Sequence, residues 1–257
     1  MASPGPIPAD LLLAAYANGL FPMADNRDSS EIFWVEPEMR AILDIDRFHL
    51  SRSLARTVRR NRFSVTVDTC FIDVVLACAA PAPGRADTWI NPIIVDSYQR
   101  LFARGNAHSV ECWRDGQLLG GLYGVSLGRA FFGESMFSRA TDASKVALAW
   151  LVARLRCGGF TLLDCQFQTE HLHSLGATEL SQSDYLTRLH CSVSPAGIPA
   201  AGAVGAAGSA VAAGDWSALD GVLAVAGAAD RAADGGASAG TATSPGHVIA
   251  QLLTNTS

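Results

Sequence analysis

Residues 109–166 read SVECWRDGQLLGGLYGVSLGRAFFGESMFSRATDASKVALAWLVARLRCGGFTLLDCQ, and this stretch decides the fold. Strand-forming residues fill four segments, 109–114, 118–127, 129–137 and 160–166. Asp115-Gly116 is typical of a tight hairpin turn, and Gly128 marks a second turn. Thr141-Asp142 begins a long helix that ends before Gly158-Gly159. The expected order is therefore three strands, one helix and a fourth strand.

This order predicts an α+β fold with an acyltransferase-like (GNAT-type) mixed sheet domain. Folds of that type that use acetyl-coenzyme A hold its pyrophosphate on a glycine-rich loop at the start of the long helix. Residues 138–143, Ser-Arg-Ala-Thr-Asp-Ala, contain no glycine and supply no such nest of backbone N–H groups. The order of elements predicts acyl transfer, while the missing loop argues against coenzyme A as the donor.

Two acidic residues lie among apolar neighbours near the ends of these strands. Glu134 belongs to the run Phe-Gly-Glu-Ser-Met-Phe, and Asp164 precedes Cys165 and Gln166. A buried carboxylate is costly unless it has a partner or a task, so the pair suggests a site in one crevice. The plainer alternatives are a hydrogen-bonded pair of Asp164 and Gln166 at the strand end, and a Glu134 paired with an arginine such as Arg139.

Composition sets broader limits. The chain has 257 residues, of which 49% are hydrophobic, enough for a sizeable core in one or two domains. The net charge of −5 gives no general attraction to polyanions, so local charge matters more. The six cysteines show no metal-ligand or disulfide spacing and are expected to be reduced, as in a cytosolic protein. No secretory signal, membrane span or metal site is expected.

The pattern along the chain predicts four parts. Residues 1–38 are expected to form a small N-terminal lobe, and residues 39–193 the catalytic domain. Residues 194–244 are rich in Ala and Gly, with few large apolar side chains, and are expected to be a flexible insertion. Residues 245–257 are apolar again and are expected to dock back on the body.

Arginines recur on one face of the helix expected over 51–62. They are Arg52, Arg56, Arg59 and Arg60, at helical spacing and with no acidic residue inside the helix. One interpretation is the solvated face of an amphipathic helix. The other is a stripe that contacts phosphates, and the absence of balancing acids favours it.

Motifs along most of the chain agree with one family. They are Gly19-Leu20-Phe21-Pro22-Met23, Trp34 before Pro37, Thr88-Trp89-Ile90, residues 108–113 (HSVECW), residues 120–125 (GGLYGV), residues 132–138 (FGESMFS), residues 143–145 (ASK), residues 164–166 (DCQ) and residues 171–177 (HLHSLGA). Over about residues 8–190 the chain resembles the leucyl/phenylalanyl-tRNA–protein transferases. Residues 245–257 are similar to the C-terminal end of that family.

The resemblance implies an enzyme that moves Leu, Phe or Met from aminoacyl-tRNA to the N-terminal Arg or Lys of a protein. The product would enter the bacterial N-degron pathway of protein degradation in the cytoplasm. It also implies an acyltransferase-like domain that needs no coenzyme A or other cofactor. The expected partners are aminoacyl-tRNA and acceptor proteins, not DNA and not a membrane.

The resemblance assigns roles to the three polar residues. Asp164 would hydrogen-bond the Gln166 amide and orient it toward the incoming amine, because positions i and i+2 of a strand share a face. Gln166 is a poor base, so we expect it to position the amine and stabilise the tetrahedral intermediate. Glu134 would bind the cationic amine of the aminoacyl group or the basic end of the acceptor.

The resemblance also implies a substrate pocket. Apolar residues would surround the donor side chain, namely Leu122, Phe131, Leu148, Leu151, Leu155 and Leu163, although spacing alone marks them as core. Tyr16, Trp34, Trp89 and Tyr98 match aromatic residues near the tRNA 3′ end, and the arginine stripe would contact the acceptor stem. The chain departs from the family pattern at Met23, where some relatives have Trp, and at residues 181–183 (SQS), where Pro-Arg-Arg is common.

Three other functions stay open at this stage. An aminoacyl-tRNA-dependent ligase could act on a cell-wall precursor or a small molecule. A hydrolase could use Ser144 and Lys145, but adjacent helical residues point about 100° apart and pair poorly. A binder of N-degron peptides or tRNA without activity would have no need of Glu134, Asp164 and Gln166.

Overall fold

The two hairpins predicted from the central stretch form the middle of a seven-stranded sheet. This computed structural model describes residues 5–82, 86–194, 212–233 and 244–254. The sheet has the order β4-β5-β6-β7-β8-β3-β9, and every neighbouring pair is antiparallel except β7–β8. Its strands are β3 (Met39–Leu43), β4 (Ser64–Val67), β5 (Ala107–Arg114), β6 (Gln117–Leu127), β7 (Ala130–Ser138), β8 (Leu162–Gln166) and β9 (Ala177–Ser181). The mixed α+β prediction is confirmed.

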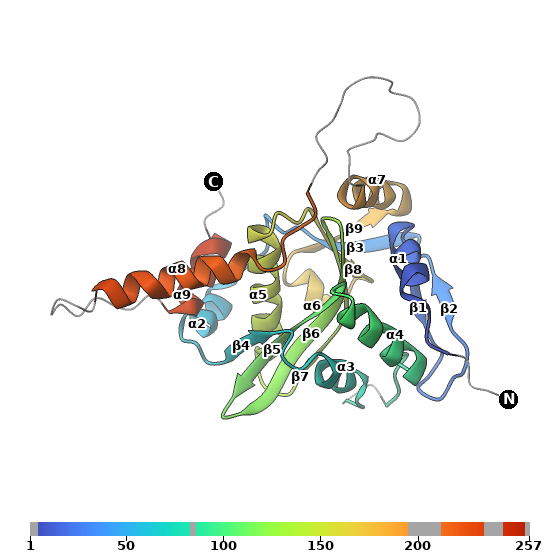
Figure 1. Cartoon of the computed structure of the whole chain (residues 1–257), viewed down its shortest axis with the longest axis horizontal. Coiled ribbons are helices and arrows are strands. Elements are labelled where there is room, and N and C mark those ends of the chain that lie inside the picture. Colours follow the sequence, from blue (N-terminus) through green and yellow to red (C-terminus); the bar gives the residue numbers. More distant parts are fainter. Residues whose placement is uncertain (1–4, 83–85, 195–211, 234–243, 255–257) are drawn as a thin grey trace, which may run out of the picture.

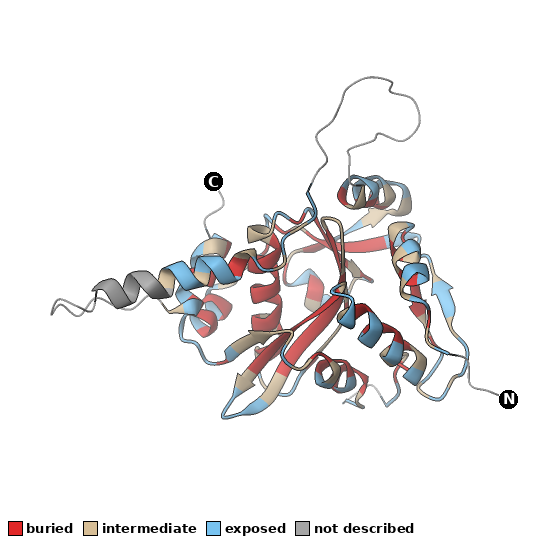
Figure 2. Ribbon diagram, viewed as in Figure 1, coloured by how far each residue is buried: buried red, intermediate tan, exposed pale blue. Residues whose placement is uncertain are grey.

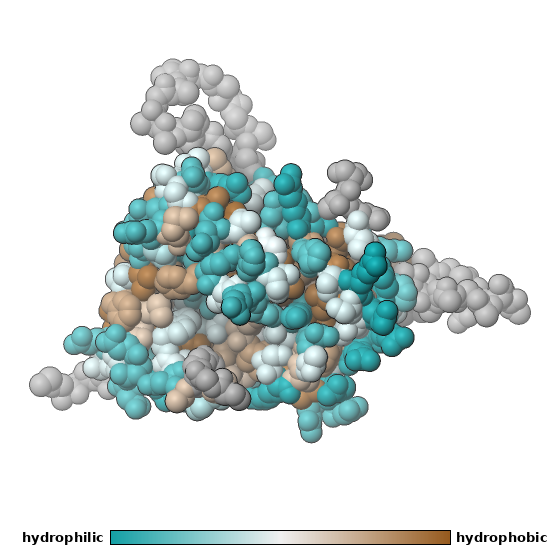
Figure 3. All heavy atoms as spheres, turned by 180° about the vertical axis from the view of Figure 1, so that it is seen from behind, coloured by the Kyte–Doolittle hydropathy of each residue, from teal (hydrophilic) through white to brown (hydrophobic). Residues whose placement is uncertain are grey.

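Helices cover both faces of this sheet (Figure 1). One face is covered by α2 (Arg52–Arg59), α5 (Ala143–Cys157) and α9 (Pro245–Thr254), and the other by α1 (Ala9–Ala17), α3 (Phe71–Ala79), α4 (Pro92–Ala103) and α7 (Gln182–Val193). Each layer has its own apolar cluster, and the central strands of the sheet together with α5 are largely buried (Figure 2). The face of the molecule turned away in Figure 1 mixes hydrophilic residues with smaller apolar areas (Figure 3).

Helix α5 begins directly against β6, beside the strands that carry the candidate site. A Cβ atom on Gly120 would lie 2.5 Å from Ala143 Cβ, so the close approach of strand and helix requires glycine there. The predicted cap differs in detail. Asp142 has φ 69° and makes no side-chain capping bond, although its Oδ2 accepts a bond from Thr57 Oγ1 at 3.3 Å.

The arginine helix is shorter than predicted. Ser51 caps α2 by accepting from the Leu54 N–H, but the helix ends at Arg59. Asn61 has φ 46°, a left-handed conformation that cannot continue an α-helix. Leu54 and Val58 are buried, so the opposite face carries the four arginines outward.

Two strands of the main sheet were not predicted. β3 and β9 are short and pair with each other, with Arg40 opposite Leu180. The other unpredicted pairing is a two-stranded sheet of β1 (Phe21–Met23) and β2 (Phe33–Val35) in the N-terminal part. Such pairings depend on residues far apart in the chain, and the sequence pattern of one short strand does not show them.

Part of the predicted flexible insertion packs on the body. The Trp216 ring stacks on His108 and Phe131, with centroid distances of 4.1 and 5.5 Å, and its Nε1 donates to Asp68 Oδ2 at 2.8 Å. Leu219, in α8 (Ala218–Ala233), is fully buried. Two large apolar side chains thus anchor these residues on the body, and the flexibility expected of the segment 194–244 stays a prediction. Residues 195–211 and 234–243 lie outside the described residues.

The C-terminal helix α9 also lies on the body. Ile249, Ala250 and Leu253 are buried in the cluster that surrounds α5. Arg156 of α5 donates to the Leu252 carbonyl of α9 at 2.5 Å. Among the described residues, no helix is long and apolar enough to cross a membrane.

Candidate active site

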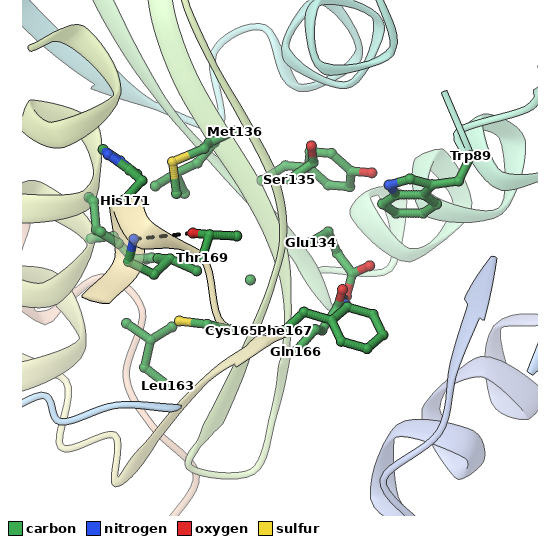
Figure 4. Close-up of a pocket in the computed structure, with 16 residues that line it drawn as sticks. Trp89, Glu134, Ser135, Met136, Leu163, Cys165, Gln166, Phe167, Thr169 and His171 are labelled. Carbon is green, nitrogen blue, oxygen red and sulfur yellow. Dashed lines mark hydrogen bonds between the residues drawn. The ribbon is translucent and has the colours of Figure 1, made fainter. Parts of the chain in front are cut away.

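A cavity of about 310 Å³ opens where β6, β7 and β8 meet α5 and α6 (Glu170–His173). Figure 4 shows Trp89 at one side and His171 at the other, with Glu134 and Gln166 between them. Its lining residues are Trp89, Leu122, Tyr123, Gly133, Glu134, Ser135, Met136, Leu148, Leu151, Leu163, Cys165, Gln166, Phe167, Thr169, His171 and Leu172. A cavity of this size is at the lower end of the usual range for small-molecule sites.

Most of the cavity wall is apolar. Leu148 and Leu151 come from one face of α5, Leu122 from β6 and Leu163 from β8, and all four are almost completely buried. Met136 of β7 adds a flexible side chain to the same wall. This wall can hold one apolar side chain of a ligand.

The polar edge of the cavity is formed by Glu134 and Gln166. β7 and β8 run parallel with Phe132 opposite Asp164, so residues two positions further along both strands come together. Gln166 Nε2 donates to Glu134 Oε1 at 3.1 Å. Because a carboxylate only accepts, the amide must present its nitrogen to Glu134, which leaves the Gln166 carbonyl oxygen to accept from a ligand.

Glu134 is held by neutral donors. Tyr16 of α1 donates to Oε1 and Tyr98 of α4 donates to Oε2, each at 2.7 Å. The two tyrosine hydroxyls also contact each other. Burial raises the pKa of Glu134 to about 7, while the bonds from Tyr16, Tyr98 and Gln166 act in the opposite direction. The carboxyl group therefore changes protonation near neutral pH.

Asp164 lies behind this edge and does not line the cavity. Arg40 Nε and Nη2 donate to its two carboxylate oxygens at 2.9 and 2.6 Å, and Tyr185 donates to Oδ2 at 2.7 Å. The predicted bond from Asp164 to the Gln166 side chain is absent among the described residues. Asp164 Oδ1 instead accepts the Gln166 backbone N–H at 2.8 Å, because Gln166 has φ 63° and leaves the regular strand geometry.

The predicted substrate-binding residues fall into three groups. Trp89, Leu122, Leu148, Leu151 and Leu163 line the cavity. Tyr16 and Tyr98 are fully buried behind Glu134, so they support the carboxylate and offer no open ring face. Phe131 and Leu155 are fully buried in the core, and the half-exposed Trp34 lies on β2, so none of these three lines the cavity.

The arginine stripe forms a separate surface. Arg52, Arg56, Arg59 and Arg60 line a hollow between α2 and α9, together with His247. None of these residues lines the cavity that holds Glu134. The two departures from the family pattern also lie outside it: Met23 is half-buried in β1, and residues 181–183 lead into α7.

Sequence reasoning missed several residues of the site. Arg40 and Tyr185 hold Asp164, and the only local signal was one arginine inside the apolar strand 39–43. Tyr123 and His171 also line the cavity, and their Oη and Nε2 atoms are buried without a hydrogen-bond partner among the described residues. The sequence favoured packing or capping for His171, but its side chain faces the cavity.

Comparison with known proteins now identifies the family. Residues 42–190 match the family described as leucyl/phenylalanyl-tRNA protein transferase, and residues 5–38 match the N-terminal domain of the same family. The chain belongs to this family. The resemblance seen in the sequence motifs is thereby confirmed.

Several bacterial members of the leucyl/phenylalanyl-tRNA protein transferase family share more than half of their aligned residues with this chain. The protein from Rhizorhabdus wittichii is 58% identical over 214 residues, which cover 83% of this chain and 86% of its own. The protein from Novosphingobium aromaticivorans is 55% identical over 265 residues, with 99% and 98% covered. The solved structure of L-PGS from Bacillus licheniformis aligns with 62% of this chain and 53% of its own, at 14% identity and a TM-score of 0.37.

Proposed function

We propose that this chain transfers Leu, Phe or Met from aminoacyl-tRNA to the N-terminal Arg or Lys of acceptor proteins in the cytoplasm, which marks them for the N-degron pathway. One observation carries the proposal: this chain, which belongs to the transferase family, has a cavity with an apolar wall and with a polar edge made by Glu134 and Gln166. This arrangement suits an ester that joins an apolar amino acid to a polar nucleic acid.

The apolar wall would receive the donor side chain. Leu122, Leu148, Leu151 and Leu163 line the cavity and would surround a side chain with an unbranched Cβ. An apolar pocket discriminates by only about 1–3 kcal/mol per methylene, so Leu, Met and Phe would share it. Trp89, at the side of the cavity, would stack on the terminal adenine, an interaction worth about 1–3 kcal/mol. Trp34 is a second aromatic candidate for contact with the tRNA 3′ end.

The polar edge would orient the reacting groups. The Gln166 carbonyl oxygen would accept an N–H of the attacking amine, and Glu134 would attract a cationic amine. Asp164 would act as a positioning residue, because it holds the Gln166 backbone and not its side chain. The aminoacyl ester is already activated, so proximity and orientation would supply much of the rate without a cofactor.

The arginine stripe would hold the acceptor stem of the tRNA. Its four arginines are exposed on α2 and the C-cap residue that follows it, and phosphate contacts of this kind carry no sequence information. That property suits an enzyme that accepts several tRNAs. We further propose that the sheet is of the GNAT type, that residues 1–38 form the N-terminal lobe and 39–193 the catalytic domain, and that 194–244 and 245–257 form an insertion and a C-terminal segment.

The test is direct transfer of label. The protein is incubated with radiolabelled Leu-tRNA and a peptide that begins with Arg, beside a matched peptide that begins with Gly. Label on the Arg peptide alone is expected. No label on either peptide would remove the transferase function, and tRNA binding without transfer would favour an inactive binder.

A further inference from the structure

Glu134 at the cavity edge and the two tyrosines behind it, Tyr16 and Tyr98, close a ring of hydrogen bonds. Tyr16 and Tyr98 both contact the Glu134 carboxylate, one at each oxygen, and their hydroxyls contact each other. The three side chains come from α1, α4 and β7, and all are at least nine-tenths buried. A ring built from three separate elements holds its members in fixed positions.

The number of protons in this ring depends on Glu134. Each tyrosine hydroxyl carries one proton, so an ionised Glu134 leaves two protons for three contacts. If both protons point to the carboxylate, the contact between the hydroxyls of Tyr16 and Tyr98 has none. A protonated Glu134 supplies the third proton, and each member of the ring then donates once and accepts once. The ring is thus complete only in the neutral form of the carboxyl group.

One acceptor site of the ionised carboxylate stays open. Oε1 accepts from Tyr16 and Gln166, whereas Oε2 accepts only from Tyr98 among the described residues. A carboxylate has about four lone-pair sites, so one on Oε2 remains. Glu134 lines the cavity, so a ligand held there lies next to this carboxylate.

The second carboxylate of the site has the opposite environment. Both oxygens of Asp164 accept from the Arg40 guanidinium, and Tyr185 donates to one of them. Arg40 makes no hydrogen bond to Glu134. The titratable and charged groups that surround Glu134 are Tyr16 from α1, Tyr98 from α4, Tyr123 from β6, Asp164 from β8 and Arg40 from β3. Two neighbouring carboxyl groups with such different surroundings are suited to different roles.

We propose that Glu134, completed by Tyr16 and Tyr98, is the proton acceptor of the transfer reaction. The inference deepens the proposed function and depends on it. The attacking α-ammonium gives one proton to Glu134 Oε2, and the hydroxyl protons turn so that Oε2–H donates to Tyr98, Tyr98 to Tyr16 and Tyr16 to Oε1. The free amine attacks the ester carbonyl carbon and forms the C–N bond.

The remaining protons balance without another reactant. The tetrahedral intermediate carries a second proton on its nitrogen, and that proton leaves with the ribose oxygen as the C–O bond breaks. The products are an amide and a tRNA with a free hydroxyl group. Glu134 returns its proton to water when the products leave. Burial holds the pKa of Glu134 near 7, so the group can both take and release this proton at neutral pH.

The experiment is a single-turnover rate measured against pH with Leu-tRNA and a saturating Arg peptide. The wild-type rate is expected to fall below a midpoint near pH 7. Glu134→Gln keeps the shape of the side chain, and its rate at pH 7 is expected to drop about 5-fold or more, because only about one tenth of an amine with a pKa near 8 is free at that pH. The pH midpoint of the Glu134→Gln rate should move to about 8, the pKa of the α-amino group of the acceptor peptide. At pH 9 the amine is already free, so the loss should become several-fold smaller.

Other outcomes overturn the proposal. An equal fold-loss for Glu134→Gln at pH 7 and pH 9 would mean that Glu134 only positions the substrates. Tyr16→Phe and Tyr98→Phe each open the ring of hydrogen bonds around Glu134. Each should therefore shift the midpoint, and unchanged midpoints in both variants would also contradict the proposal. A wild-type protein that transfers no label at any pH would instead reject the proposed function.

Discussion

Arg40 of β3 and Asp164 of β8 form a buried ion pair in which the guanidinium group donates to both carboxylate oxygens. Their side chains are 1% and 0% exposed, and the closest nitrogen–oxygen distance is 2.6 Å. The Arg40 guanidinium also lies over the rings of Phe21 and Tyr185 and donates to the Gly19 carbonyl oxygen at 3.0 Å. One arginine thus joins the N-terminal part, α7 and the strand that carries Gln166.

Arg40→Met is expected to lower the free energy of unfolding by about 3–5 kcal/mol, because it leaves Asp164 buried without a counter-charge. Urea unfolding at pH 7 measures the change. The matched control is Arg40→Met combined with Asp164→Leu, which removes both charges and should recover most of the loss. If the double variant were less stable than Arg40→Met alone, the ion pair would not be the cause.

Glu134 gives the protein a stability that depends on pH. Its pKa is raised from 4.5 to about 7 in the folded state, so the folded protein holds this proton where the unfolded chain has lost it. The stabilisation is full below about pH 4.5 and is lost as the pH rises through 7. The free energy of unfolding of the wild type should therefore fall by up to about 3 kcal/mol between pH 5 and pH 8, relative to that of Glu134→Gln. Urea unfolding of both proteins across this range checks it, and a constant difference would contradict the assigned protonation.

Local patterns in the sequence were sufficient for the centre of the fold. Asp115-Gly116 and Gly128 are turn signals between adjacent strands, and α5 has enough apolar residues to be recognised alone. The strand-end acids Glu134 and Asp164 also stood out, because charge is rare in such surroundings. The predicted pairing of Asp164 with the Gln166 side chain failed, because it assumed a regular strand at a residue with positive φ.

Long-range contacts explain what the sequence did not show. Tyr16 and Tyr98 reach Glu134 from 118 and 36 residues away, and Arg40 reaches Asp164 from 124 residues away. The apolar neighbours of Arg40 in strand 39–43 hint that it is buried, but they do not show which acid it pairs with. The sequence also does not show where Trp216 packs. Its ring stacks on His108 and Phe131, which lie on different strands of the folded sheet.

Charge reversal at Arg56 and Arg60 should weaken tRNA binding through lost phosphate contacts. Each lost contact is expected to reduce the slope of log K against log salt by about 0.7–0.9. Binding of aminoacyl-tRNA is measured from 50 to 300 mM salt for the double Glu variant. The control is Arg100→Glu, an exposed arginine on α4 away from the stripe. An unchanged slope in the double variant would show that the stripe is only a solvated helix face.

Leu148 and Leu155 offer a matched test of donor selectivity within α5. Both are buried leucines of the same helix, but Leu148 lines the cavity and Leu155 does not. Either change to Ala should cost about 2–5 kcal/mol of stability, because each leaves a space in the core. Only Leu148→Ala enlarges the donor pocket, so it alone should raise transfer of Phe relative to Leu, by about 5- to 10-fold. Competition between Phe-tRNA and Leu-tRNA for one Arg peptide measures this ratio. If Leu155→Ala shifted the ratio as much as Leu148→Ala, general loosening of the core would explain both, and the cavity would not be the donor pocket.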